Sequence, residues 1–107
     1  MTIFSVTDEN RYITLEARGH ANSFYLDNDG NDLLCAIVST ITQVAYLGCE
    51  KYSDECNVIS CFDGNFSFKC RSNPQTRAII ETALLGLRDA AEQYPDFIRE
   101  KGEADHK

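Results

Sequence analysis

The chain has 107 residues, of which 43% are hydrophobic and 25% charged, so length and composition predict one globular domain over residues 1–107. The net charge of −7 argues against a nucleic-acid-binding surface, which needs clustered Lys and Arg, and it fits a basic partner. The opening segment MTIFSV does not resemble a signal peptide, and the uncharged run of residues 33–49 is too short and too polar to favour a membrane span. We therefore expect a cytoplasmic protein that binds neither nucleic acid nor membrane.

Two strands are predicted at the start of the chain. Residues 3–8 are β-prone, and residues 12–20 alternate between an apolar face and a polar face that ends in His20. The polar cluster at residues 8–11 predicts the turn of an antiparallel hairpin. Gly19 lies on the apolar face, where a bulkier side chain would block a helix packed against the strand.

A polar loop and a helix follow. Residues 22–31 are rich in Asn, Asp and Gly and are the best candidate for a mobile lid. Asp32 is the predicted N-cap of a helix that ends near Leu47, with Gly48 as its C′ residue. A wide apolar arc predicts that this helix is deeply buried, and the arc comprises Leu34, Ile37, Val38, Ile41, Val44 and Ala45.

The remaining sequence predicts a second hairpin and a second helix. Residues 57–62 and 65–71 are expected to be strands joined by an Asp63-Gly64 turn. The second helix begins at Asn73-Pro74 and ends at Tyr94-Pro95, and residues from about 100 to 107 are expected to fray. Its apolar face comprises Ala78, Ile79, Ala83, Leu84, Leu87 and Ala91. The order β-β-α-β-β-α predicts the α+β class, with a mainly antiparallel sheet and two helices.

The five cysteines are expected to be mostly free thiols in a reducing cytoplasm. Cys56 and Cys61 have a spacing that could chelate zinc, but no second Cys/His pair at ligand spacing follows, so we expect no metal and no other cofactor. Cys61 and Cys70 are instead expected to fill the core. A redox pair of Cys35 and Cys49 is an alternative, although about four helical turns, roughly 21 Å, would separate them.

Cys35 and His20 are the strongest candidates for a chemical site. Cys35 would lie three residues after the N-cap, where free N–H groups and the helix dipole favour a thiolate, the nucleophilic form. His20 is the only histidine in the folded part of the sequence, and an imidazole near the sulfur could act as general base and acid.

Simpler interpretations of the same residues remain open. A cysteine in an apolar helix usually fills the core, and a histidine at a strand end is usually solvated. Asp32 needs no role beyond capping. Ser39 lies on the same helix face as Asp32 and Cys35, and its hydroxyl could bond to a carbonyl of its own helix.

The motif Gly19-His20-Ala21, followed by Asp32-x-x-Cys35-Ala36-x-x-Ser39, closely resembles that of the ribosomal-processing cysteine protease family, Prp. The resemblance extends from Thr2 to about Ile98 and includes the predicted order of elements. It implies a homodimeric cysteine protease that removes an N-terminal extension from ribosomal protein L twenty-seven by cutting after a Phe.

The same resemblance implies roles for individual residues. Cys35 corresponds to the nucleophile and His20 to the general base and acid. Asp32 and Ser39 are supporting residues, and Gly19 and Ala21 shape the histidine turn. Residues 22–31 correspond to a mobile segment over the site. The residues of this segment that are candidates for contact with the substrate are Phe24, Tyr25, Asp29 and Gly30. This loop is longer than is usual in the family, and its two aromatic residues stand where the family tends to have smaller ones.

The alternative from another class is a non-catalytic binding module for a ribosomal or other basic protein. Thiol reactivity separates the two, because an activated Cys35 would be alkylated well ahead of the other four cysteines.

Overall fold

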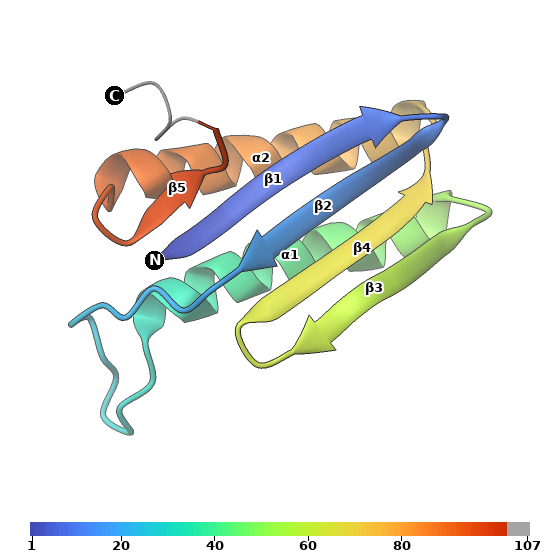
Figure 1. Cartoon of the computed structure of the whole chain (residues 1–107). Coiled ribbons are helices and arrows are strands. Elements are labelled where there is room, and N and C mark those ends of the chain that lie inside the picture. Colours follow the sequence, from blue (N-terminus) through green and yellow to red (C-terminus); the bar gives the residue numbers. More distant parts are fainter. Residues whose placement is uncertain (103–107) are drawn as a thin grey trace.

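A five-stranded sheet and two helices form two layers, in the order β1-β2-α1-β3-β4-α2-β5 (Figure 1). The computed structural model describes residues 1–102. The elements are β1 (Thr2–Glu9), β2 (Tyr12–Arg18), α1 (Leu33–Tyr52), β3 (Cys56–Phe62), β4 (Asn65–Arg71), α2 (Pro74–Gln93) and β5 (Ile98–Glu100). Both helices cover the same face of the sheet. The predicted α+β class and the mainly antiparallel sheet are confirmed.

The sheet has the strand order β3-β4-β2-β1-β5, so the two predicted hairpins pair through β2 and β4. That pairing is antiparallel and places Arg18, the last residue of β2, opposite Asn65, the first residue of β4. The chain that leaves β2 therefore starts beside the turn between β3 and β4. This juxtaposition positions the candidate site.

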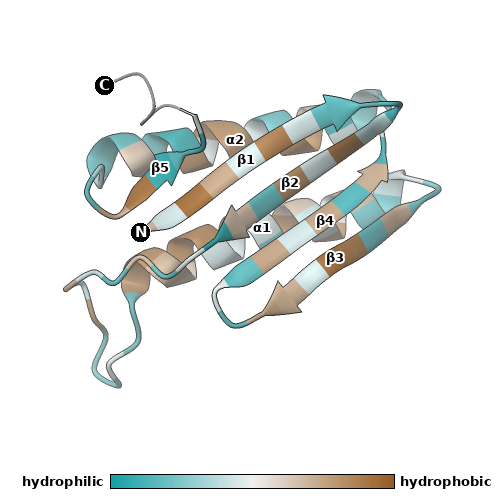
Figure 2. Ribbon diagram, viewed as in Figure 1, coloured by the Kyte–Doolittle hydropathy of each residue, from teal (hydrophilic) through white to brown (hydrophobic). Residues whose placement is uncertain are grey.

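The alternation of β2 produces the predicted buried face. Ile13, Leu15 and Ala17 are buried, and Figure 2 shows the matching alternation of apolar and polar residues along β1 and β2. The large side chains with almost no exposed surface come from both layers, and they are Phe4, Phe68, Leu15, Leu34, Ile80, Leu87 and Ile98. The core therefore lies between the sheet and the two helices.

Helix α1 differs from the prediction at its C-terminal end. It continues through Gly48 to Tyr52, and Ser53 is the C-cap. Gly48 is a packing residue, because a Cβ there would lie 3.2 Å from Cδ1 of Ile79 on α2. The glycine allows the two helices to approach each other and does not terminate the first one.

The prediction that α1 is deeply buried was wrong for its outer half. The buried stripe is narrow and comprises Leu34, Val38, Thr42, Ala45 and Cys49. Val44 and Leu47 remain 62% and 61% exposed. The physical reason is that a two-layer fold covers only the inner side of each helix.

Helix α2 begins as predicted. The side chain of Asn73 accepts a hydrogen bond from the Thr76 amide, and the Thr76 hydroxyl accepts one from the Asn73 amide, which completes a capping box. The buried residues of α2 are Thr76, Ile80, Ala83, Leu87 and Ala90. Only Ala83 and Leu87 of these belong to the predicted apolar face. Ala78 in particular is exposed.

Strand β5 was not predicted. It pairs with β1 in parallel, Thr2 opposite Ile98, and the Lys101 amide donates to the Phe4 carbonyl at 2.8 Å. Strand β5 has only three residues, and two of them, Arg99 and Glu100, are charged, so the sequence shows no alternating apolar pattern there. The strand forms because the segment pairs with β1. The remainder of the predicted frayed tail, residues 103–107, lies outside the described residues.

Helix α1 is long enough and apolar enough to cross a membrane, judged by length and composition alone. It extends to Tyr52, beyond the uncharged run of residues 33–49 on which the sequence prediction was based. The core helix of a soluble protein passes the same test. The packing of its buried stripe against the sheet and α2 accounts for its apolar character here.

Candidate active site

The segment that carries His20 is held by backbone contacts on both sides. Gly19 has a φ of +89° and turns the chain out of β2, which ends at Arg18 rather than at the predicted His20. The Gly19 amide donates to the Gly64 carbonyl at 2.6 Å, and the Thr2 hydroxyl donates to the Gly19 carbonyl at 3.0 Å. The His20 side chain is thereby presented at the surface, 50% exposed.

We had expected a helix to limit the space around Gly19, but Met1, just before β1, limits it instead. A Cβ at this position would overlap the carbonyl oxygen of Met1. Only glycine combines the positive φ with this close approach.

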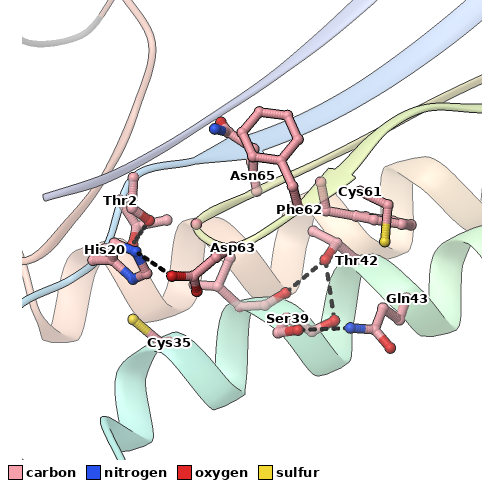
Figure 3. A pocket seen from close by; sticks show the side chains of 15 residues that line it. Thr2, His20, Cys35, Ser39, Thr42, Gln43, Cys61, Phe62, Asp63 and Asn65 are labelled. Atoms are coloured by element: carbon pink, nitrogen blue, oxygen red, sulfur yellow. Dashed lines mark hydrogen bonds and ion pairs between the residues drawn. The ribbon is translucent and has the colours of Figure 1, made fainter.

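Cys35 lies at the predicted place in the first turn of α1, three residues after the N-cap Asp32. Its Sγ accepts a hydrogen bond from the backbone amide of Ala21 at 3.2 Å. Because Ala21 directly follows His20 in the chain, this bond brings the sulfur next to the histidine. Figure 3 shows the Cys35 sulfur pointing toward the His20 ring. Within residues 1–102, no hydrogen bond joins the two side chains.

Asp32 ties the loop to the start of the helix. Its carboxylate accepts from the amide and hydroxyl of Ser23, both at 2.7 Å, and from the amides of Leu34 and Cys35 at 2.9 and 3.3 Å. Burial disfavours the charged carboxylate, but the hydrogen bonds from Ser23, Cys35 and Leu34 outweigh it and lower the pKa of Asp32. Asp32 therefore fixes the backbone at the start of α1, where Cys35 lies.

The loop of residues 22–31 is packed on the connection between α2 and β5. The ring of Phe24 lies 5.5 Å from that of Phe97, and the ring of Tyr25 lies 5.3 Å from that of Tyr94. Its tip is an internally bonded turn, in which the Asp27 carboxylate accepts from the amides of Asp29 and Asn31 and Gly30 has a φ of +83°. Four residues of this loop were candidates for contact with the substrate: Phe24, Tyr25, Asp29 and Gly30. None of them lines the pocket beside Cys35.

A cavity of about 450 Å³ lies between α1 and the turn from β3 to β4 (Figure 3). Its walls include Cys35, Val38, Ser39, Thr42 and Gln43 of α1 and Phe62, Asp63, Gly64 and Phe66 of the hairpin, with His20 beside them. The Ser39 hydroxyl accepts from the Gln43 amide group at 2.7 Å, whereas it is Thr42 that bonds back to carbonyls of its own helix. Ser39 thus faces the cavity that holds Cys35 and His20.

Asp63 and Gly64 are functional candidates that the sequence indicated only as a turn. The Asp63 Oδ2 lies 3.6 Å from the His20 Nε2. A Cβ on Gly64 would lie 2.8 Å from the same nitrogen. The pairing of β2 with β4 brings these residues together, and no local sequence signal indicates it.

The other cysteines have different surroundings. Cys49 and Cys70 are buried, which confirms the core role of Cys70, but Cys61 is exposed and lines the cavity, so its predicted core role was wrong. Burial, together with the neighbouring Cys70, raises the pKa of Cys56 to about 12. The hydrogen bond with Cys49 and burial also raise the pKa of Cys70. Among residues 1–102, no group of three or more His, Cys, Asp or Glu side chains could hold a metal ion.

Comparisons with known proteins identify the family and the fold. The family model of cysteine protease Prp matches residues 1–99. Two crystal structures of an essential ribosomal processing protease Prp from S. aureus are similar, one with a covalently linked product peptide (TM-score 0.76, 21% identity, covering 94% of this chain and 97% of that one) and one with a substrate peptide (TM-score 0.67, 20% identity, 94% and 98%).

A third structure, SMU.848 from Streptococcus mutans, is similar with a TM-score of 0.67 and 27% identity over 94% of this chain and 92% of that one. No curated protein matches the sequence. The match over residues 1–99 covers nearly the whole chain, including His20 and Cys35. The chain therefore belongs to the cysteine protease Prp family.

Proposed function

We propose that this protease removes the N-terminal extension of ribosomal protein L twenty-seven, cutting after a Phe with Cys35 as nucleophile and His20 as general base and acid. The observation that carries the proposal is the bond from the Ala21 amide to the Cys35 sulfur, which places the thiol beside His20 at a helix start. The similar S. aureus protein is described as a ribosomal processing protease and was crystallised with peptides.

The cavity supports a peptide substrate with an aromatic side chain. Val38, Phe62 and Phe66 give it an apolar part, and about 450 Å³ exceeds the volume of one phenyl group. The net charge of −7 favours the approach of a basic ribosomal protein. A substrate that belongs to the ribosome places the reaction in the cytoplasm.

The proposed reaction has two steps. The Cys35 thiol transfers its proton to His20, and the thiolate attacks the carbonyl carbon of the Phe residue, while backbone N–H groups at the start of α1 stabilise the oxyanion. His20 returns the proton to the departing amine, which leaves a thioester on Cys35. The departing amine is the new N-terminus of the shortened protein. Water, deprotonated by His20, then attacks the thioester, the proton passes from His20 to the leaving Cys35 sulfur, and the N-terminal extension is released as a carboxylic acid.

Asp32, Ser39, Gly19 and Ala21 support this pair in different ways. Asp32 fixes the first turn of α1, and Gly19 fixes the turn that carries His20. Ala21 supplies the amide on the sulfur. Ser39 is one of the polar residues that line the cavity, and it lies one turn along α1 from Cys35. The loop that includes Phe24, Tyr25, Asp29 and Gly30 is proposed to contact the substrate after it moves toward the cavity.

The proposed enzyme is a homodimer that forms through the outer faces of α1 and α2. These faces enclose an apolar groove of about 510 Å³, lined by Thr40, Ile41, Val44, Ala45, Ala78, Ile79, Thr82, Ala83 and Gly86. Val44, which lines the groove, is 62% exposed, and Leu47 on α1 and Leu85 on α2 are 61% and 67% exposed. Burial of these side chains against a second copy would add the apolar core that a short chain lacks.

The test is a cleavage assay on a peptide that spans the extended N-terminus of ribosomal protein L twenty-seven, with products identified by mass. Wild-type protein should give a single cut after a Phe. Cys35→Ala and His20→Ala should give none while remaining folded, and Cys56→Ala, the same change outside the cavity, should retain the cut. Activity in either site variant would disprove the assignment, and binding of the uncut peptide by wild-type protein would favour the non-catalytic binding module.

A further inference from the structure

We infer that Asp63 is a positioning residue that orients the imidazole of His20 toward Cys35. Its carboxylate accepts a hydrogen bond from the Nε2–H group of His20, so that Nδ1 is the nitrogen available to the sulfur. The inference rests on the proposed roles of His20 and Cys35, and it adds a third side chain that comes from the turn between β3 and β4.

The turn between β3 and β4 is fixed to the histidine segment by the backbone. The bond from the Gly19 amide to the Gly64 carbonyl, at 2.6 Å, joins the residue before His20 to the residue after Asp63. Gly64 has no side chain, so the imidazole lies directly over the turn, 2.8 Å from the place that a Cβ would occupy. The backbone of Asp63 is therefore held next to His20 by this bond and by the glycine geometry, while its side chain remains exposed.

Asp63 and Cys35 both lie next to the His20 ring. Asp63 Oδ2 is 3.6 Å from His20 Nε2, and in Figure 3 the Cys35 sulfur also lies near the ring. A neutral imidazole carries one N–H group, and its other nitrogen accepts. If Nε2 donates to Asp63, Nδ1 accepts the thiol proton of Cys35, and the product is an imidazolium next to a carboxylate and a thiolate.

The distance and exposure agree with a contact that tightens when substrate binds. At 3.6 Å the pair is longer than a hydrogen bond, and hydrogen bonds between catalytic groups are often long in free enzymes. Asp63 is 95% exposed, so the pair contributes little to the stability of the free protein. Because Asp63 lines the cavity, a bound peptide would exclude water from this pair and strengthen it.

The first experiment compares Asp63→Ala, which removes the acceptor, with Asp63→Asn, whose amide oxygen still accepts but whose charge is gone. Asp63→Ala should lower kcat for the peptide by roughly 10-fold to 100-fold with little change in KM, because a misplaced general base slows the chemical step and not binding. Asp63→Asn should restore most of kcat. Asp96→Ala removes an exposed aspartate outside the cavity and should match wild type.

A second measurement needs no peptide. The rate at which iodoacetamide alkylates Cys35, read by mass at that residue, should fall about 5-fold to 50-fold in Asp63→Ala and recover in Asp63→Asn, because the same base takes the thiol proton. Wild-type rates in Asp63→Ala by both measurements would overturn the inference, as would equal loss in Asp63→Ala and Asp63→Asn. If Cys35→Ala still cleaved the peptide, the proposed function would fail instead, and the alkylation rates would still decide the role of Asp63.

Discussion

The backbone bond between Gly19 and Gly64 joins the end of β2 to the turn between β3 and β4. Both glycines have positive φ, at +89° and +78°, and each leaves room for a neighbour that a side chain would displace. Gly19 makes room for the carbonyl of Met1, and Gly64 makes room for the ring of His20. The position of His20 therefore depends on two glycines, which have no side chain that could take part in the reaction.

Replacement of Gly64 by Ala tests this dependence. The new Cβ would lie 2.8 Å from His20 Nε2 and would require a φ of +78°, so the ring must move. We expect kcat/KM to fall by about 10-fold or more, and stability to fall by about 1–2 kcal/mol, the cost of a non-glycine residue at this φ. Steady-state kinetics and urea unfolding measure the two effects.

Gly102→Ala is the matched control for that variant. Gly102 also has a positive φ, +96°, but among residues 1–102 no atom outside its chain neighbours lies within 4 Å of its Cβ position. It should show the backbone cost in stability without the loss of activity. Equal kinetics for the two alanine variants would contradict a steric role for Gly64.

Asp32 should stabilise the protein in a pH-dependent manner. Asp32→Asn keeps a capping side chain but loses the charge, and we expect it to lower the free energy of unfolding by about 1 kcal/mol at neutral pH, because hydrogen bonds to a charged acceptor are stronger than those to a neutral one. The folded pKa of Asp32 lies below its ordinary value of 3.8, so the stabilisation is complete above pH 3.8 and is lost as pH falls through the lower, folded value.

Urea unfolding of wild type and Asp32→Asn across the acid range measures this linkage. The difference in unfolding free energy should be constant above pH 3.8 and shrink below it, because Asn does not titrate. Asp96→Asn controls for the loss of one acidic side chain. A difference that stays unchanged down to the acid limit would mean that the Asp32 charge does not stabilise the fold.

The five thiols should react with iodoacetamide in a defined order near neutral pH. Cys35, in the first turn of α1, and the exposed Cys61 should react first. Cys56 and Cys70 should react last because their raised pKa values leave little thiolate, and Cys49 is protected by burial. Peptide mass spectrometry over time gives the order. Early modification of Cys70 in folded protein would show that the core opens more readily than its packing indicates.

The outer helix face should determine the oligomeric state. Val44→Glu places a charge in the apolar groove and should convert the proposed dimer to monomer in analytical ultracentrifugation. Ile59→Glu is the control, because Ile59 is 59% exposed on β3, in the other layer. A wild-type protein that is monomeric at high concentration would rule out the dimer, and dissociation by Ile59→Glu alone would place the interface on the sheet edge.

The local elements follow from the sequence alone. Alternation defined β2 and β4, Asp32 and Asn73 defined the starts of the helices, and Asp63-Gly64 defined a turn, because each signal acts within a few residues of its effect. The pair His20 and Cys35 was also predicted from the sequence, from the residue types that thiol chemistry requires and from their place next to predicted element ends.

Tertiary structure decided what depends on contacts between distant segments. Pairing of β2 with β4 brings Asp63 to His20, pairing with β1 creates β5, and packing on Ile79 keeps Gly48 inside a helix. It also decides that apolar side chains on the outer side of α1, such as Val44 and Leu47, stay exposed. These outcomes depend on which surfaces pack against each other. The sequence does not determine them locally, because a hydrophobic pattern indicates that a face is buried but not which segment covers it.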